Sequence, residues 1–184
     1  MSIYKKFNED ISVIKVSDRN FTANISENWS IGQTANGGYS MAIIAKACSE
    51  YLNHKDPLVL SANYLERVEF GPADIEIFKI SSSKSTSTAS ITLKQKGIIK
   101  IFATATFTDF SKMKGINEKL REEPIFDSYE DCIQVPYKEG FNPKLDKNLE
   151  KKYCLDSIWW DKPNETNNAC LNLYMGWKDG GRVD

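Results

Sequence analysis

The sequence predicts an α+β domain in which one long central helix is wrapped by a curved antiparallel sheet. The helix is predicted from Asn36-Gly37-Gly38-Tyr39, where an asparagine can cap the first turn, and from the apolar run that continues to Leu52. Apolar residues cover most directions around this helix, so other structure must enclose it. After Pro57 the hydrophobic pattern changes to a period of two, which is typical of strands. One buried helix followed by a meander of strands is an α+β arrangement.

The elements can be placed in order along the chain. Two short strands are predicted at 11–16 and 20–25, around a turn at Asp18-Arg19. The central helix follows, and its polar residues gather mainly on one side. Lys96-Gly97 predicts a tight hairpin between the last two strands of the meander. The four strands after the helix are predicted at 58–65, 73–80, 86–95 and 98–109.

The alternating hydrophobic pattern of the chain ends after Phe110. Residues 111–152 are charged and irregular and are predicted to be a linker. Strand-like patterns return at 155–160 and 169–177. We therefore divide the chain into a domain at 1–110, the linker, and a final part at 153–184 that is too short to close a core of its own.

Composition excludes several classes of partner and site. The net charge of −1 provides no basic field for nucleic acid, and no apolar run is long enough to span a membrane. The N-terminus lacks the apolar core of a signal peptide, so we expect a cytoplasmic protein. With one histidine and four widely spaced cysteines, neither a metal site nor a Ser–His or Cys–His nucleophile is expected. Any hydrolysis would have to use carboxylates, hydroxyls, amides and helix ends.

Four segments carry a family resemblance. They are Trp29 with Asn36-Gly37-Gly38-Tyr39, Ser61-Ala-Asn-Tyr-Leu65, the Ser/Thr-rich 81–90, and Gln95-Lys-Gly97. Together they resemble the acyl-CoA thioesterase-like, double-hotdog family over approximately residues 10–110. The resemblance implies a hotdog fold and an acyl-CoA thioester as substrate, with no cofactor. The stretch from Gly176 to Asp184 looks like the opening of a second repeat, so 153–184 is expected to hold the first strands of an incomplete second hotdog.

The same resemblance leaves the catalytic residues unidentified. In the family the catalytic Asp lies on the helix of the second repeat, assisted by a Thr and a Gln from its strands. Those positions would follow Asp184. In the first repeat the helix starts at Asn36, and Phe107 stands where the Gln of the second repeat would align.

The helix start is the leading candidate site. The first backbone N–H groups of a helix have no intrahelical acceptor and lie at the positive end of the macrodipole, so they can hold an oxyanion. Gly37 and Gly38 lack side chains and would let a thioester carbonyl approach closely. The alternative is structural: Asn36 caps the helix, and the glycines let it pack tightly against a strand.

Other residues have a functional and a structural interpretation. Trp29 could cover an acyl channel or simply pack before the helix. Asn63 and Tyr64 could line the pocket, and Tyr64 could equally be a core residue. Three lysines near the hairpin could meet coenzyme A phosphates or protect a sheet edge. Gln95 is expected to face solvent or bond locally, and His54 to be a polar residue near the helix end. The hydroxyls of 81–90 are expected to form an exposed sheet face, because no base is available to activate them. The lysines are Lys94, Lys96 and Lys100.

Three functions remain open from the sequence. The first is an acyl-CoA thioesterase, in which a carboxylate activates water and a helix N-terminus holds the oxyanion. The second is a non-catalytic hotdog that binds acyl thioesters or serves in assembly. The third is a fragment whose activity belongs to a longer parent. A single hotdog leaves a sheet edge uncovered, so we also expect a homodimer.

Overall fold

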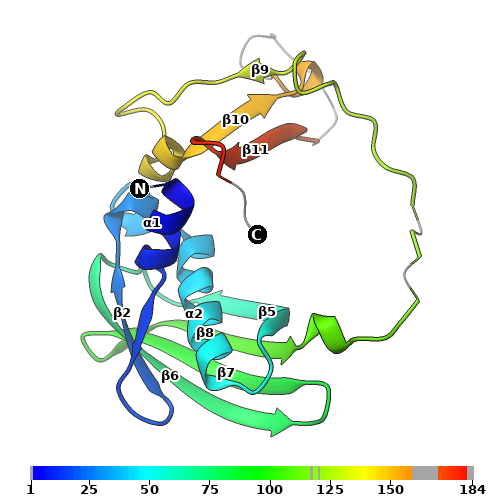
Figure 1. Ribbon diagram of the computed structural model, residues 1–184. Helices are drawn as coiled ribbons and strands as arrows, with labels where there is room; N and C mark the ends of the chain where they lie inside the picture. The colour runs from blue at the N-terminus through cyan, green and yellow to red at the C-terminus, as the bar shows by residue number, and fades with distance from the viewer. Residues whose placement is uncertain (1, 117, 120, 159–169, 182–184) are drawn as a thin grey trace. The chain divides into compact units, whose positions relative to one another are not determined.

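A six-stranded sheet and the helix it curves around form the larger of two units, Lys6–Gly115 (Figure 1). The second unit comprises Met1–Lys5 and Ile116–Asp184. The computed structural model describes residues 2–116, 118–119, 121–158 and 170–181.

The elements of the larger unit match the predicted order closely. The central helix is α2 (Gly37–Tyr51), and α1 (Ile3–Asp10) precedes the sheet. The strands are β1 (Val13–Lys15), β2 (Asn20–Ile25), β3 (Ser30–Ile31), β4 (Thr34–Ala35), β5 (Asp56–Tyr64), β6 (Gly71–Ser82), β7 (Ser87–Gln95) and β8 (Ile98–Thr108), with 3₁₀ helices at Glu27–Trp29 and Phe110–Lys112.

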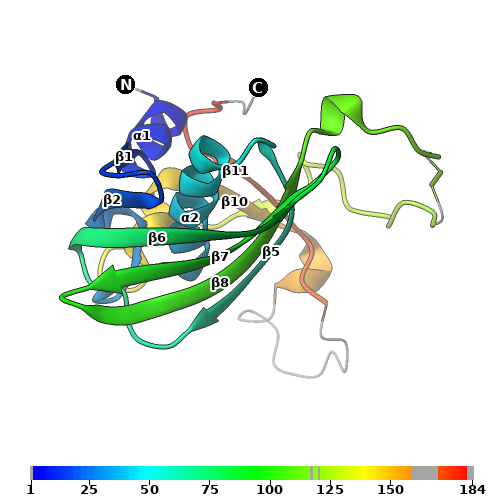
Figure 2. The ribbon, with the colours of Figure 1, turned by 90° about the horizontal axis from the view of Figure 1, so that it is seen from below.

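The sheet has the strand order β1-β2-β6-β7-β8-β5, and every neighbouring pair is antiparallel. The short β3 and β4 pair with each other. Figure 2 shows the long strands β6, β7 and β8 curving past α2. The two sheet edges are therefore β1, with three residues, and β5, with nine. This is the α+β hotdog arrangement that the sequence predicts.

The core lies between α2 and the concave face of the sheet. On α2, Ile43, Ile44, Ala47 and Cys48 are fully buried. Along β7 and β8 every second residue is buried against them, as the period of two requires. These strand residues are Ala89, Ile91, Leu93, Ile101, Ala103, Ala105 and Phe107. The helix is thus enclosed because most of its circumference is apolar.

The N-terminal helix α1 was not predicted from the sequence. It is short and has no fully buried residue, so the sequence holds no long apolar stripe that would predict a helix here. Phe7 from this helix packs edge-on against Trp29, with ring centroids 4.9 Å apart. The Asp10 carboxylate accepts hydrogen bonds from the indole N–H of Trp29 at 2.8 Å and from the Asn28 side chain at 3.1 Å. These contacts hold the segment before α2 in place.

The second unit contains a three-stranded antiparallel sheet in the order β11-β10-β9. Its strands are β9 (Ile133–Gln134), β10 (Leu149–Tyr153) and β11 (Leu173–Trp177), and 3₁₀ helices lie at Lys144–Asn148 and Leu155–Ser157. The stretch 111–152, predicted to be an irregular linker, therefore contributes two strands.

One strand prediction in this unit is wrong and one is largely right. The strand predicted at 155–160 is a 3₁₀ helix at Leu155–Ser157, and residues 159–160 lie outside the described residues. The strand predicted at 169–177 corresponds to β11. The interpretation of 153–184 as the start of a second hotdog repeat stays a prediction.

None of the helices in the described part of the chain is both long enough and apolar enough to cross a membrane.

Candidate functional site

The first turn of α2 leaves two backbone donors without a protein acceptor. Asn36 is extended, with φ −61° and ψ 141°, and its side-chain Oδ1 accepts a 3.1 Å hydrogen bond from the Tyr39 N–H. The Asn36 N–H donates to the Trp29 carbonyl at 2.8 Å. Of the four N–H groups that a helix start leaves over, those of Gly37 and Gly38 remain unpaired among the described residues. The start of α2 therefore has both features that the sequence predicts: the Asn36 cap and, among the described residues, unpaired N–H groups at Gly37 and Gly38.

Tyr64 explains why a glycine is needed at position 37. Its hydroxyl donates a 2.7 Å hydrogen bond to the Gly37 carbonyl. A Cβ atom at Gly37 would lie 3.0 Å from Tyr64 Cζ and 3.0 Å from its oxygen, closer than ordinary van der Waals contact. Partial burial raises the pKa of Tyr64, so the hydroxyl keeps the proton that it donates.

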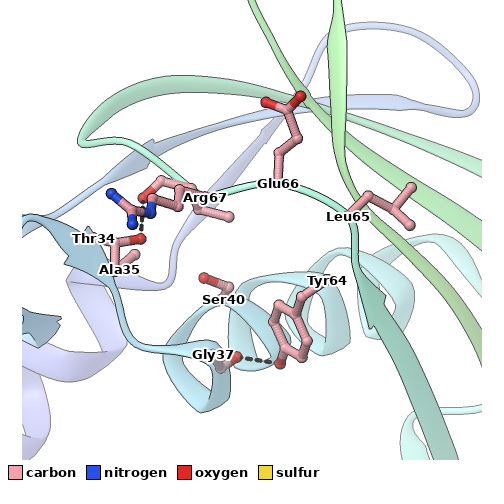
Figure 3. A pocket seen from close by; sticks show the side chains of 9 residues that line it. Thr34, Ala35, Gly37, Ser40, Tyr64, Leu65, Glu66 and Arg67 are labelled. Atoms are coloured by element: carbon pink, nitrogen blue, oxygen red, sulfur yellow. Dashed lines mark hydrogen bonds between the residues drawn. The ribbon is translucent and has the colours of Figure 1, made fainter.

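A pocket of about 480 Å³ opens beside this helix start (Figure 3). Its wall comes from β4, the first turn of α2, the end of β5 and the connection to β6. Nine residues line it: Thr34, Ala35, Gly37, Ser40, Tyr64, Leu65, Glu66, Arg67 and Val68. The volume falls in the range typical of small-molecule sites.

The connection between β5 and β6 is held firmly as the pocket's outer wall. Gln95 is 3% exposed and uses its side-chain amide as a clamp. Its Oε1 accepts from the Glu69 N–H at 2.9 Å, while Nε2 donates to the carbonyls of Glu69 at 2.8 Å and Pro72 at 3.2 Å. At the pocket, the Val68 carbonyl accepts from the Thr34 hydroxyl at 3.0 Å. Gln95 is buried and its partners lie 23 and 26 residues away in the sequence, so the expectation that it faces solvent or bonds locally is wrong.

Three lysines near the hairpin are engaged in ion pairs. Lys100 is 6% exposed, and its pair lies beside the pocket wall. β7 is an interior strand, so Lys94 on it does not protect a sheet edge, and that interpretation is wrong. That the three lysines bind the phosphates of coenzyme A stays a prediction. The pairs are Lys94–Glu76 at 3.0 Å, Lys96–Glu69 at 2.5 Å and Lys100–Glu66 at 3.0 Å.

Two predicted aromatic residues lie in the core behind the helix start. Trp29 is 4% exposed and Tyr39 is 3% exposed, and their rings stack with centroids 6.1 Å apart. The Tyr39 hydroxyl donates to the Asp10 carbonyl at 2.7 Å and accepts from the Ser26 N–H at 3.0 Å. Burial raises the pKa of Tyr39 to about 12. Neither residue is among the nine that line the pocket.

Asn63 lies on the other face of the sheet from Tyr64. Successive side chains of a strand point to opposite faces, and Tyr64 reaches the helix start. Asn63 is exposed and pairs in register with Phe102 of β8. Of the two predicted β5 residues, the structure therefore brings Tyr64 to the pocket and directs Asn63 away from it.

His54 and Ser87 form a buried hydrogen-bonded pair that was not predicted from the sequence. His54 Nδ1 lies 2.8 Å from the Ser87 hydroxyl, and Nε2 lies 3.3 Å from the Lys84 carbonyl. A carbonyl only accepts, so Nε2 carries the proton and Nδ1 accepts from the serine. His54 is 6% exposed and Ser87 is fully buried, so no substrate reaches the hydroxyl. The pair fastens the β6–β7 turn to the end of α2, and the predicted exposed face at 81–90 is wrong for Ser87.

Sequence reasoning missed most of the pocket wall. Ser40, Leu65, Glu66, Arg67 and Val68 come from a helix turn and an irregular connection, and no periodic pattern marks them. The available signal was the position of Glu66 and Arg67, which directly follow the Tyr64-Leu65 motif. Their role depends on the path of the connection, which is set by distant partners such as Gln95.

Comparisons with known proteins agree with this geometry. Residues 25–108 match the family model of the acyl-CoA thioesterase N-terminal domain. The thioesterase-like protein TwmA of Talaromyces wortmannii is 28% identical over 96 residues, which are 50% of this chain and 28% of TwmA.

Two solved structures show the same fold. A conserved hot dog fold protein of unknown function from Alicyclobacillus acidocaldarius aligns with a TM-score of 0.76 and 15% identity, over 95% of this chain and 63% of that one. The acyl-CoA thioesterase II TesB2 from Mycobacterium marinum aligns with a TM-score of 0.71 and 10% identity, over 97% and 62%. The chain thus spans less than two thirds of each of these relatives.

The predicted resemblance is confirmed by the family match and by the fold. The matched segment covers the helix start, the pocket wall and the long strands of the sheet. Residues 25–108 therefore resemble the acyl-CoA thioesterase N-terminal domain, and the unit that contains them has the hotdog fold.

Proposed function

We propose that this domain binds acyl-CoA thioesters at the N-terminus of α2 and contributes to their hydrolysis. The observation that carries the proposal is the N–H group of Gly37, which lines the 480 Å³ pocket and, like that of its neighbour Gly38, has no acceptor among the described residues. The match to the acyl-CoA thioesterase N-terminal domain supports the substrate class.

The helix start suits a thioester carbonyl for two physical reasons. Its free N–H groups and the macrodipole favour the negative charge that develops on the carbonyl oxygen during attack by water. The donors are preorganised, because the Asn36 cap and the Tyr64 hydroxyl fix the turn on both sides. Such donors lose little free energy to reorganisation when the reaction occurs.

The carboxylate that activates water is proposed to come from outside this domain. Glu66 brings the one carboxylate among the nine residues that line the pocket. Its side chain points away from Gly37 and Ser40 in Figure 3, and Lys100 holds it at 3.0 Å. The family resemblance assigns the catalytic Asp, Thr and Gln to a second repeat. In this proposal the domain supplies the oxyanion and acyl site, and a second hotdog supplies the base.

Binding and turnover of acyl-CoAs test the proposal. Calorimetric titration with acyl-CoAs of increasing acyl length should give saturable binding that free coenzyme A does not match. Tyr64→Phe should weaken binding several-fold because the first turn of α2 loses its hydroxyl clamp. Tyr51→Phe, at the opposite end of α2, is the matched control. Equal affinity for acyl-CoA in all three proteins, or none in the wild type, would refute the site.

The alternative function is an acyl-thioester-binding hotdog without catalysis. The absence of a free carboxylate among the described pocket residues favours it for the domain acting alone. Measurable acyl-CoA binding without hydrolysis would support this alternative, whereas hydrolysis well above background would support the enzyme.

We further propose a homodimer in the cytoplasm, joined along β5. β5 is the longer sheet edge and exposes apolar side chains, with Leu58 43% and Val59 58% exposed. Such an edge offers backbone groups and apolar surface to a second copy. The four free thiols suit a reducing compartment.

The oligomeric state tests the dimer by light scattering after size exclusion. Val59→Lys should convert the dimer to a monomer, because a lysine opposes edge pairing. Ile14→Lys on the short opposite edge, β1, is the matched control, since Ile14 is 72% exposed. A wild-type monomer at micromolar concentration would contradict the proposal.

A further inference from the structure

Two buried cysteines lie just beyond the paired strands β9 and β10 of the second unit, whose small sheet is labelled in Figure 1. β9 and β10 are antiparallel, with Lys152 opposite Gln134 and Tyr153 opposite Ile133. The next pair in this register joins Cys154 to Cys132. Their Sγ atoms lie 3.4 Å apart.

The pairing position suits a covalent link between the two side chains. The Val135 N–H donates to the Lys151 carbonyl at 3.2 Å, which makes this a hydrogen-bonded pair of the ladder. Hydrogen-bonded and non-hydrogen-bonded pairs alternate along an antiparallel ladder. Cys132 and Cys154 therefore occupy a non-hydrogen-bonded position, where facing Cα atoms are about 4.5 Å apart. A disulfide spans Cα separations of about 4.4–6.8 Å.

The two thiols are buried close together, and burial keeps Cys132 protonated. Cys132 is 5% exposed and Cys154 is 2% exposed. Burial, and then the hydrogen bond to Cys154, raises the pKa of Cys132 to about 11. Among nearby charges, Asp127 raises this pKa further and Lys152 lowers it. Cys132 therefore stays a thiol at neutral pH, and its reaction with an oxidant is slow.

We propose that Cys132 and Cys154 form a reversible disulfide that clamps β9 to β10 when the chain meets a small-molecule disulfide such as oxidised glutathione. The Cys132 thiol, the more exposed of the two, loses its proton to solvent, and its sulfur attacks the glutathione disulfide. One glutathione thiolate leaves, and a mixed disulfide forms. The Cys154 thiol then loses its proton, its sulfur attacks Cys132 Sγ, and the second glutathione leaves as a thiolate. The two released thiolates take up the two protons that the cysteines lose. The two cysteines are oxidised by two electrons, and oxidised glutathione is reduced to two thiols.

A zinc site is the competing use of the same side chains. Asp127 brings a carboxylate within 4.8 Å of both sulfur atoms. However, Asp127 already accepts a 2.8 Å hydrogen bond from the Leu155 N–H, and structural zinc sites usually have four protein ligands. Two sulfur atoms and one committed carboxylate fall short of that set, so the disulfide is the better use of the geometry.

Peptide mapping after oxidation tests the proposal in the full chain. Cys170→Ser is the background, because Cys170 is an exposed thiol that could form disulfides between chains. After incubation with oxidised glutathione, the intact mass should fall by two hydrogen atoms, and a proteolytic digest should contain a 132–154 linked peptide that dithiothreitol releases. Cleavage of the 133–153 segment by a protease should become several-fold slower, and Cys154→Ser should abolish both effects.

Three results would overturn the proposal. One is that both thiols remain open to alkylation after oxidation and unfolding. Another is a disulfide that joins either residue to Cys48 instead. The third is that the purified chain carries one zinc ion per molecule, whose removal exposes both cysteines. The peptide map of the Cys170→Ser protein does not depend on whether the further Cys154→Ser variant folds, and none of these results bears on acyl-CoA binding.

Discussion

Replacement of Gln95 by methionine should destabilise the hotdog unit and loosen the pocket wall. Methionine keeps the volume of the side chain but removes three hydrogen bonds, two to Glu69 and one to Pro72. Each such bond contributes about 0.5–1.5 kcal/mol net. Glu69 is exposed, so water can replace part of the loss there. We therefore expect the free energy of unfolding to fall by about 2 kcal/mol.

Urea denaturation measures this effect. With a slope of about 2 kcal/mol/M, a loss of about 2 kcal/mol lowers the midpoint by about 1 M. Gln33→Met is the matched control, because Gln33 is exposed in the turn between β3 and β4, and its change should stay within about 0.5 kcal/mol. If Gln95→Met unfolds within 0.5 kcal/mol of the wild type, the clamp does not hold the connection between β5 and β6, and our account of the pocket wall is wrong.

Two further substitutions should affect stability through buried polar groups. The folded-state pKa of Tyr39 is about 12 against an ordinary value of 10.0, so the unfolded chain loses this proton first. The contribution of Tyr39 to the free energy of unfolding is complete below pH 10 and falls by about 2–3 kcal/mol as the pH rises to 12. Urea titrations at pH 9 to 12 should show a smaller loss of stability in Tyr39→Phe than in the wild type. His54→Ala should lower the free energy of unfolding by about 1 kcal/mol, because the buried Ser87 hydroxyl loses its 2.8 Å partner and keeps only the Ser82 hydroxyl at 3.1 Å.

Each of these substitutions has a control. Burial raises the pKa of Cys48 to about 12, so this thiol also stabilises the folded protein less as the pH rises through the alkaline range. Cys48→Ala should therefore remove a separate part of the alkaline loss of stability. An equally steep fall in Tyr39→Phe would show that its hydroxyl does not contribute. Asn53 lies next to His54 but is exposed, so Asn53→Ala should hardly change the free energy of unfolding. If His54→Ala is as stable as Asn53→Ala, His54 does not fasten the β6–β7 turn to the end of α2.

The fold followed from the sequence because its signals are local and periodic. The apolar circumference of α2, the Asn36 cap and the alternation along β7 and β8 each depend on residues close together in the chain. The helix start of the site was predictable for the same reason. Tyr64 was named, but its contact with Gly37 depends on how β5 packs across 27 residues of sequence.

The rest of the site could not be predicted, because distant partners determine it. Gln95 holds a connection 26 residues away, and the buried pair of His54 and Ser87 forms across 33 residues. This pair was not predicted, because spacing in the sequence does not limit which side chains a sheet brings together. In the second unit, β10 is rich in charged residues and lacks an apolar alternation, so its strand was missed.

Comparison of Gly37→Pro with Gly37→Ala tests the central claim most directly. Both substitutions add the same Cβ contact with Tyr64, but only proline removes the N–H that we assign to the thioester carbonyl. Proline is tolerated at the first position of a helix, and the extended Asn36 before it is compatible with proline. The account predicts that Gly37→Pro binds acyl-CoA about three- to tenfold more weakly than Gly37→Ala in calorimetric titrations. Equal affinities of the two variants would contradict it.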